Sequence, residues 1–184
     1  MNTGLIPVRY ATALLDFASI SNEQDSVYTE SKAIIQSFSQ FSELRTVLDN
    51  PVLAKAEKRK IILLSAGGKT TKSFERFLDL LLHNNREIHL QSIALKFIDL
   101  YRKKKNIYYG KLTTATEIDS AIEKKLMKLV ENQTGGTIEM EKIIDSSILG
   151  GFMFEVDFVR WDASLSGQLR RIKNEYIEKN NKTV

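Results

Sequence analysis

Apolar residues recur at intervals of three and four through the N-terminal part of the chain, with polar residues between them. This spacing places the apolar side chains on one face of an α-helix, so it predicts amphipathic helices. Six such segments follow one another with short turns, which is typical of a compact helical bundle. They cover about residues 7–18, 23–39, 44–49, 54–65, 74–82 and 89–105.

Five of these helices carry a clear stripe of apolar residues that we expect to face the bundle core. The predicted stripes are Tyr10, Ala13, Leu14 and Phe17; Val27, Ile34 and Phe38; Leu44, Val47 and Leu48; Phe74, Phe77, Leu78, Leu81 and Leu82; and Leu90, Ile93, Ala94, Phe97, Ile98 and Tyr101.

Proline and glycine mark the ends of several of these helices. Pro7 suits a first helical position, where its missing N–H costs nothing. Asn50 precedes Pro51 and is therefore disfavoured in the helical region, which predicts a helix end there. Gly67 and Gly68 provide the left-handed conformation with which helices commonly stop.

The pattern changes after the basic run 102–105. Residues 107–116 are rich in β-branched and aromatic side chains and predict a strand. Apolar and polar residues alternate over 137–144, with Ile138, Met140 and Ile143 on the expected buried side. Residues 152–156 predict a third strand, and 158–161 are a candidate fourth.

Two helices complete this second part of the chain. Ser120 and Glu123 have the spacing of a capping box and predict a helix start. Its apolar residues are Ile122, Leu126, Leu129 and Val130, and those of the last helix are Leu165, Leu169, Ile172 and Tyr176. The predicted fold is mainly α: a six-helix bundle over 1–105, then an α/β domain over 106–184 with a short sheet and a C-terminal helix.

Composition excludes several kinds of protein. The 184 residues contain no cysteine, so disulfides and cysteine-based zinc sites or catalysis are excluded. No apolar run approaches the roughly 18 residues of a membrane span, and the N-terminus does not resemble a secretory signal. We therefore expect the chain to remain on the side of the membrane where it is made. Its net charge is +4, and basic and acidic residues are interspersed along the chain. A nucleic-acid-binding surface would instead gather basic residues in one patch.

The pair Gly150-Gly151 raises the question of a phosphate-binding loop. No lysine follows it as in a Walker loop, and it leads into a strand rather than a helix. A bulge or a close approach of two backbones at a strand start is the favoured interpretation. Asp162 and Ser164, just before the last helix, are interpreted as its N-cap.

The remaining polar residues predict no catalytic, cofactor or metal site. His83 and His89 have no ligand or nucleophile at a suitable spacing. The run Arg102–Lys105 could bind phosphate, but a basic helix end that complements the helix dipole is favoured. Glu139, Glu141 and Glu155 fit the outward positions of half-buried strands.

Several motifs together resemble one known family over nearly the whole chain. They are Arg9-Tyr-Ala-x-Ala-Leu-x-x-x-Ala, Asn50-Pro51, Asn84-x-Arg86, and a C-terminal motif of Asp145, Ser147, Gly150, Gly151, Asp162, Ser164 and Leu169. The chain resembles the delta subunits of bacterial F-type ATP synthases, equivalent to the mitochondrial oligomycin-sensitivity-conferring protein. It departs from the family at Asp157, where a glycine turn is common.

The resemblance implies a non-catalytic stator subunit of the peripheral stalk, without cofactors. The helical bundle would bind N-terminal helices of alpha subunits, and the α/β domain would bind the b subunits. Rotation would thereby be coupled to ATP synthesis. The complex would hold the chain at the cytoplasmic face of the bacterial inner membrane, with no membrane contact of its own.

In this family, the first and fifth helices form the groove for the alpha subunit. The apolar candidates on them are Tyr10, Ala13, Leu14, Phe77, Leu78 and Leu81, some of which must belong to the core. The alternative function is a basic helical protein that binds nucleic acid through residues 55–60 and 102–105. A recognition helix or aromatic stacking signature for that function is absent from the sequence.

Overall fold

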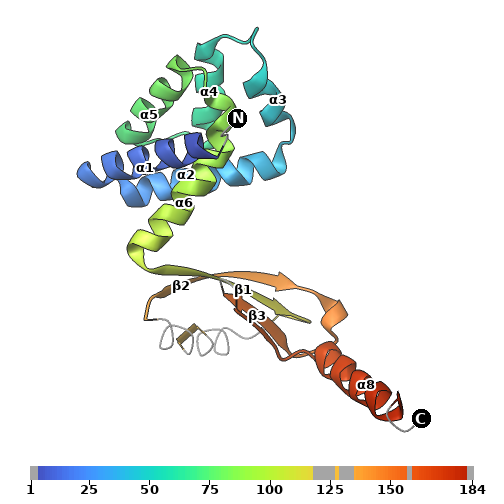
Figure 1. Cartoon of the computed structure of the whole chain (residues 1–184). Coiled ribbons are helices and arrows are strands. Elements are labelled where there is room, and N and C mark those ends of the chain that lie inside the picture. Colours follow the sequence, from blue (N-terminus) through green and yellow to red (C-terminus); the bar gives the residue numbers. More distant parts are fainter. Residues whose placement is uncertain (1–3, 118–126, 129–134, 157–158, 182–184) are drawn as a thin grey trace. The chain divides into compact units, whose positions relative to one another are not determined.

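The chain folds into two compact units, Met1–Lys105 and Asn106–Val184. The computed structural model describes residues 4–117, 127–128, 135–156 and 159–181 (Figure 1). The first unit is helical, and the second combines a sheet with a helix.

The described part of the first unit contains six α-helices, as predicted. They are α1 (Leu5–Ile20), α2 (Gln24–Gln40), α3 (Glu43–Asp49), α4 (Lys55–Ser65), α5 (Lys72–His83) and α6 (Leu90–Lys105), with a short 3-10 helix η1 (Glu87–His89) before α6. The predicted helix ends are confirmed at Asn50, which is extended, and at Gly67 and Gly68, which have φ values of +104° and +80°.

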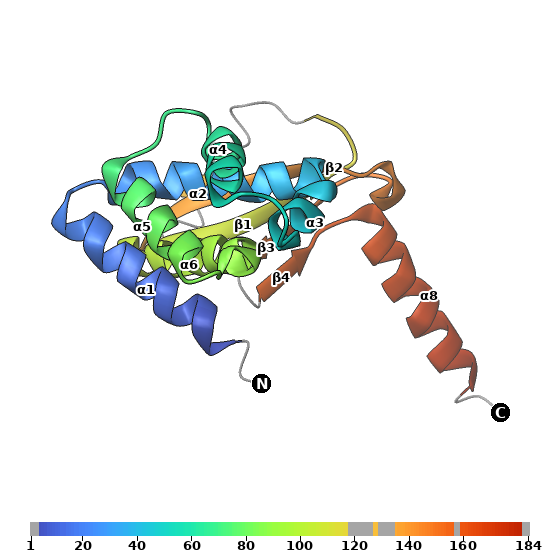
Figure 2. The same ribbon diagram turned by 90° about the horizontal axis from the view of Figure 1, so that it is seen from above.

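The core of the bundle forms where α6 packs along both α1 and α2 (Figure 1). α5 contacts α1 and α4 (Figure 2). All predicted stripe residues of α2, α5 and α6 are buried, which confirms the helical periodicity there. In α3, Leu44 and Leu48 are buried, whereas Val47 is half-buried.

The stripe predicted for α1 was largely wrong. Its buried residues are Pro7, Ala11, Leu14, Leu15 and Ala18. Of the predicted four, Leu14 alone is buried, Tyr10 and Phe17 are half-buried, and Ala13 is exposed. α1 carries apolar residues on most of its circumference, so periodicity cannot identify the buried side. The small side chains of Ala11 and Ala18, both 0% exposed, suit its close contact with the rest of the bundle.

The second unit is built on a four-stranded mixed sheet with the order β2-β1-β3-β4. The strands are β1 (Ile107–Thr114), β2 (Thr137–Ile144), β3 (Phe152–Val156) and β4 (Val159–Asp162), so the candidate fourth strand is confirmed. β1 pairs with β2 in parallel and with β3 antiparallel, and β3 pairs with β4 antiparallel. The predicted helix with Ile122, Leu126, Leu129 and Val130 lies outside the described residues.

One face of this sheet carries the unit's small core. Leu112, Ile138, Phe154 and Val156 are buried, and Tyr108, Met140 and Phe152 pack against them. The alternation predicted for β2 is confirmed at Ile138, whereas Ile143 is half-buried.

In the described part of the unit, the other elements are a short 3-10 helix η2 (Ser146–Ile148) and a long helix α8 (Leu165–Asn181). The predicted stripe of α8 is present but does not face a core. Leu165, Leu169, Ile172 and Tyr176 are 49%, 55%, 63% and 68% exposed. Periodicity locates an apolar face, but it cannot tell whether that face is covered within the chain or by a partner.

A single residue, Asn106, separates α6 from β1. Its φ of 52° is left-handed, a conformation that asparagine tolerates. The carbonyl of Asn106 accepts a hydrogen bond from Thr137 N at 3.2 Å. One residue therefore connects the bundle to the sheet.

Candidate docking surfaces

The boundary between α1 and α5 brings together half-buried and exposed apolar side chains. Tyr10 meets Phe77 edge-on, with ring centroids 6.4 Å apart, and Asn84 Nδ2 donates to the Tyr10 hydroxyl at 3.3 Å. At the other end, the Arg76 guanidinium lies 6.0 Å from the centroid of the Phe17 ring. The two helices are thus paired in antiparallel fashion along this boundary.

Ala13 and Leu80 both belong to the helix stripes that carry these contacts. Ala13 lies between Tyr10 and Phe17 on one stripe of α1, and Leu80 lies between Arg76 and Asn84 on one stripe of α5. Both are exposed, Leu80 by 52%. We call Tyr10, Ala13, Phe17, Arg76 and Leu80 the α1–α5 face.

The six residues expected at the alpha-subunit groove have different positions. Leu14, Phe77, Leu78 and Leu81 are at most 7% exposed and belong to the core. Tyr10 and Ala13 reach the surface and lie on the α1–α5 face. Leu80 and Phe17, which the sequence did not suggest for this role, lie beside them.

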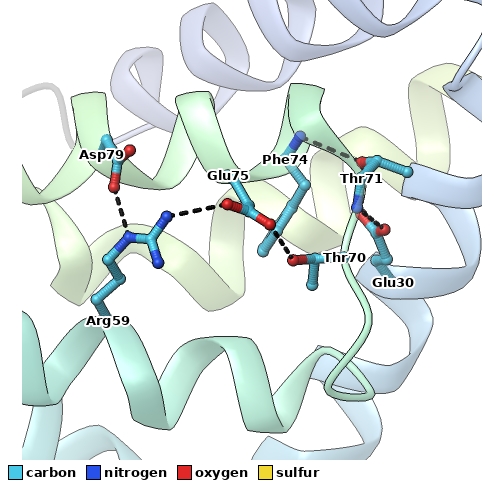
Figure 3. A network of polar contacts seen from close by, with 7 residues as sticks. All are labelled: Glu30, Arg59, Thr70, Thr71, Phe74, Glu75 and Asp79. Atoms are coloured by element: carbon cyan, nitrogen blue, oxygen red, sulfur yellow. Dashed lines mark hydrogen bonds and ion pairs between the residues drawn. The ribbon is translucent and has the colours of Figure 1, made fainter.

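A network of polar contacts holds the start of α5 against α2 (Figure 3). The buried carboxylate of Glu30 accepts from Thr71 N at 2.6 Å and from Thr71 Oγ1 at 3.1 Å. The Thr71 hydroxyl also caps α5 by accepting from Phe74 N at 3.2 Å. Burial raises the pKa of Glu30, and the charges of Glu23 and Glu75 act in the same direction.

A second part of this network joins α4 to α5. Arg59 donates to Asp79 Oδ1 at 2.7 Å and to Glu75 Oε2 at 3.1 Å, while Thr70 Oγ1 donates to Glu75 Oε1 at 3.3 Å (Figure 3). These contacts fix the rotation of α5 and therefore the direction in which Leu80 points. From the sequence, Thr71 before an apolar helix could have indicated the cap of α5. The burial of Glu30 could not be predicted, because no neighbouring residue in the sequence indicates it.

In the C-terminal motif, backbone hydrogen bonds connect the segment from η2 to β3 with the start of α8. Asp145 Oδ1 accepts from Ser147 N at 2.9 Å, and hydrogen bonds from Ser147 lower the pKa of Asp145. Leu165 N donates to Gly150 O at 3.0 Å, and Ala163 N donates to Phe152 O at 3.0 Å. These two hydrogen bonds join the segment around Gly150 and Gly151 to the start of α8, although β3 and β4 lie between them in the sequence.

Gly151 is required at this point for two reasons. Its φ of +75° is left-handed, and a Cβ there would lie 2.2 Å from Ala163 O, far inside contact distance. The predicted close approach of two backbones is confirmed at this residue.

The interpretation of Asp162 as the helix N-cap needs correction. Asp162 ends β4, and α8 begins at Leu165, so the N-cap is Ser164. The Ser164 hydroxyl accepts from Gly167 N at 3.0 Å and donates to Asp162 Oδ1, which also accepts from Ser164 N at 3.0 Å. Asp162 therefore orients the cap, and these hydrogen bonds from Ser164 lower its pKa.

The basic run at the end of α6 is engaged within the bundle. Arg102 Nε donates to the Tyr28 hydroxyl at 3.0 Å, and Lys104 Nζ donates to Ser19 Oγ at 2.7 Å. Lys105 pairs with Asp25 at 3.2 Å, and the hydroxyl of Tyr101 donates to the same carboxylate at 2.7 Å. These contacts tie the last turn of α6 to α1 and α2, which supports its structural interpretation.

Among the described residues, no group of three or more His, Cys, Asp or Glu side chains is placed to hold a metal ion. Within the same part of the chain, no helix combines the length and the apolar character needed to cross a membrane.

The chain matches one protein family over nearly its whole length. The family model described as ATP synthase delta (OSCP) subunit matches residues 6–176. The chain is 42% identical to ATP synthase subunit delta of Phocaeicola vulgatus and 38% identical to that of Bacteroides thetaiotaomicron, with all of each chain covered. It is 34% identical to that of Prochlorococcus marinus strain MIT 9211, over 94% of both chains.

A solved structure has the same fold. A chain in the cryo-EM structure of the Toxoplasma gondii mitochondrial ATP synthase hexamer superposes with a TM-score of 0.68 at 22% identity, covering 93% of this chain and 97% of that one. With the full-length family match, the conclusion is direct: the chain belongs to the ATP synthase delta (OSCP) subunit family and is a non-catalytic stator subunit of the F-type ATP synthase.

Proposed function

We propose that the two units divide the contacts of this stator subunit. The bundle binds N-terminal helices of alpha subunits, and the unit from Asn106 to Val184 binds the ends of the b-subunit helices. The subunit then holds the catalytic head against the turning of the rotor, so that rotation is coupled to ATP synthesis. A stator subunit needs tight binding to its partners and a rigid fold, and it needs no catalytic residues.

The α1–α5 face supports the proposed binding of an alpha-subunit helix. A helix that docks into a groove presents apolar side chains spaced three and four residues apart. Ala13 and Leu80 are exposed on this face, and the half-buried Tyr10 and Phe17 add aromatic surface to it. The contacts of Glu30 and Arg59 keep α5 in position, so little ordering is needed on binding.

The observation that carries the proposal is the exposed stripe of α8. Leu165, Leu169, Ile172 and Tyr176 follow one another at steps of four, three and four residues. This is the spacing with which one helix packs against another in a coiled coil. An apolar stripe of this length fits a helical partner, as the b-subunit ends are expected to be.

The test is calorimetry of the full chain with two peptides, one from the N-terminal helix of an alpha subunit and one from the last helix of a b subunit. We expect each peptide to bind with unchanged affinity when the other is already bound. Displacement of one peptide by the other, or binding of only one, would contradict the division of contacts.

The bacterial relatives support a location for the assembled subunit. As part of the ATP synthase, it is associated with the membrane through the complex. We place it at the cytoplasmic face of the bacterial inner membrane, with membrane contact only through the complex.

A further inference from the structure

Leu149 has a backbone conformation that leucine rarely adopts. It follows η2 and has a φ of 64°, in the left-handed region. In this region the Cβ atom comes too close to a backbone carbonyl oxygen, and glycine and asparagine are the residues that tolerate it. Among the described residues, the other non-glycine positions with positive φ are all asparagines, namely Asn22, Asn85 and Asn106. Leu149 is the exception to this usage.

Contacts on both sides hold Leu149 in this conformation. Ile148 before it is buried, with 2% exposure. Gly150 after it accepts a hydrogen bond from Leu165 N through its carbonyl oxygen at 3.0 Å, and Leu149 N itself donates to Ser146 O at 3.1 Å. The surrounding structure therefore fixes the turn, and the leucine adds a strain that asparagine would avoid.

Core packing does not account for a leucine at this position, because its side chain is 65% exposed. An exposed leucine alone is common on protein surfaces and needs no explanation. An exposed leucine that also strains its backbone costs stability without filling the core, and such strain is typical of functional sites. The combination indicates that a partner covers Leu149.

Leu149 lies beside the start of the exposed stripe of α8. Leu165 is the first residue of that stripe and packs against Gly150, since a Cβ added to Gly150 would lie 2.7 Å from Leu165 Cδ1. Leu149 and Gly150 are consecutive, so their Cα atoms are about 3.8 Å apart. An exposed apolar residue therefore adjoins the N-terminal end of the stripe.

The stripe determines the kind of partner. Its steps of four, three and four residues are those of helix packing against helix. The exposed residues Lys173 and Glu175 flank it with opposite charges, so apolar character rather than net charge selects the partner. On the basis of the function proposed for α8, we propose that Leu149 extends this surface: the b-subunit helix continues past Leu165 and covers Leu149 with a further apolar residue.

The test is whether stability and binding change in opposite directions at Leu149. Leu149→Asn relieves the strain, so the urea midpoint of the C-terminal unit should rise. The fluorescence of Trp161 in β4, the single tryptophan of the chain, reports this unfolding. The same variant should bind the b-subunit peptide about tenfold more weakly in calorimetry of the full chain, because the peptide no longer buries a leucine side chain. A purely structural residue would change both in the same direction.

Three further variants separate the side chain from the backbone. Leu149→Ala removes the apolar contact but keeps the strain, so it should lose the same affinity without a gain in stability. Leu149→Met keeps an apolar side chain of similar volume and should bind nearly as the wild type does. Leu64→Asn is the matched control, since Leu64 is 73% exposed but lies on α4 of the bundle, and its affinity for the b-subunit peptide should be unchanged.

Ile172→Asp changes the stripe itself and distinguishes the role of Leu149 from the function proposed for α8. Weak binding in Ile172→Asp with wild-type affinity in Leu149→Asn would overturn the extension to Leu149 and leave the binding of α8 intact. Unchanged affinity in Ile172→Asp would reject both. A lower urea midpoint in Leu149→Asn would mean that folding requires the leucine. A wild-type dimer that Leu149→Asn dissociates in sedimentation would mean that a second copy of the chain covers it, and either result would overturn the proposal.

Discussion

Ala13 illustrates how much a small exposed residue can contribute to a surface. It lies between Tyr10 and Phe17 on one stripe of α1, so a larger or charged side chain there would meet a partner that binds the α1–α5 face. Because it is exposed, its substitution tests binding without disturbing the core.

We expect Ala13→Asp to weaken the alpha-subunit peptide by roughly 2–4 kcal/mol, through an unpaired charge buried at the contact. Calorimetry of the full chain measures this loss. Thr12→Asp is the control, because Thr12 is exposed on the same helix but turned about 100° from Ala13. Equal losses in both variants would mean that net charge, and not the α1–α5 face, determines the affinity.

Glu30 predicts a pH dependence of stability. Its pKa in the folded chain is raised above 4.5, mainly by burial, so the folded state holds this proton more tightly than the unfolded state does. The contribution of Glu30 to stability is therefore largest below its unfolded pKa and declines as pH rises through the folded value.

Glu30→Gln removes this titration. Relative to the wild type, the variant should gain stability as pH rises from about 4 to about 7, as measured by urea unfolding. Groups that do not interact with Glu30, including Asp145, whose pKa is lowered by hydrogen bonds from Ser147, are common to both chains and cancel in the difference. A difference independent of pH would show that Glu30 titrates normally.

Gly151 can be tested against a glycine with similar backbone conformation. Gly151→Val should destabilise the C-terminal unit by on the order of 1–3 kcal/mol for its left-handed φ, and further through the clash with Ala163 O. Gly135→Val is the matched control, since Gly135 has a φ of +68° but no atom within 4 Å of an added Cβ. Chemical denaturation measures the free energy of unfolding of both variants and so separates backbone strain from the clash with Ala163 O. Equal losses of stability would mean that the clash contributes nothing.

At the scale of secondary structure, α8 uses different residues for its stability and for its proposed binding. Its cap depends on Ser164 and Asp162, whereas its exposed stripe makes few contacts in the described chain. Substitutions on the stripe should therefore change binding and leave the fold intact.

Ile172→Asp should weaken the b-subunit peptide by several kcal/mol, because Ile172 is central in the stripe and a buried unpaired charge is costly at a helix interface. Asn174→Asp adds the same charge on another side of α8 and should have little effect. Binding of the alpha-subunit peptide should be unchanged in both. A loss of alpha-peptide binding in Ile172→Asp would contradict independent surfaces.

The elements also show what periodicity can and cannot predict. α5 and α6 each bury one narrow stripe, so their core residues were predicted correctly. α1 is apolar on most sides, and its buried face depends on where α5 and α6 pack. The stripe of α8 was found, but its spacing does not tell whether another part of the chain or a partner covers it.

For the candidate site, the sequence indicated Tyr10, Ala13 and Gly151. It did not indicate Leu80, because exposure on a helix depends on the rotation of that helix. That rotation is set by Glu30 and Arg59, whose partners are distant in the sequence.

For the whole molecule, the division into two compact units predicts that the N-terminal unit folds without the second. A fragment ending at Lys105 keeps the buried residues of the bundle, which come from Met1–Lys105. Circular dichroism of a fragment ending at Lys105 should show a helical protein with cooperative unfolding. An unfolded fragment would mean that the bundle depends on the second unit.

The one-residue connection between α6 and β1 has a mechanical consequence. A pull on the C-terminal unit has no slack chain to extend, so the load enters the bundle at the last turn of α6. That turn is fastened to Asp25, Tyr28 and Ser19 by its tyrosine and basic side chains. Tension is therefore spread into α1 and α2 before it reaches the earlier turns of α6, and these contacts oppose peeling of the helix from its C-terminal end.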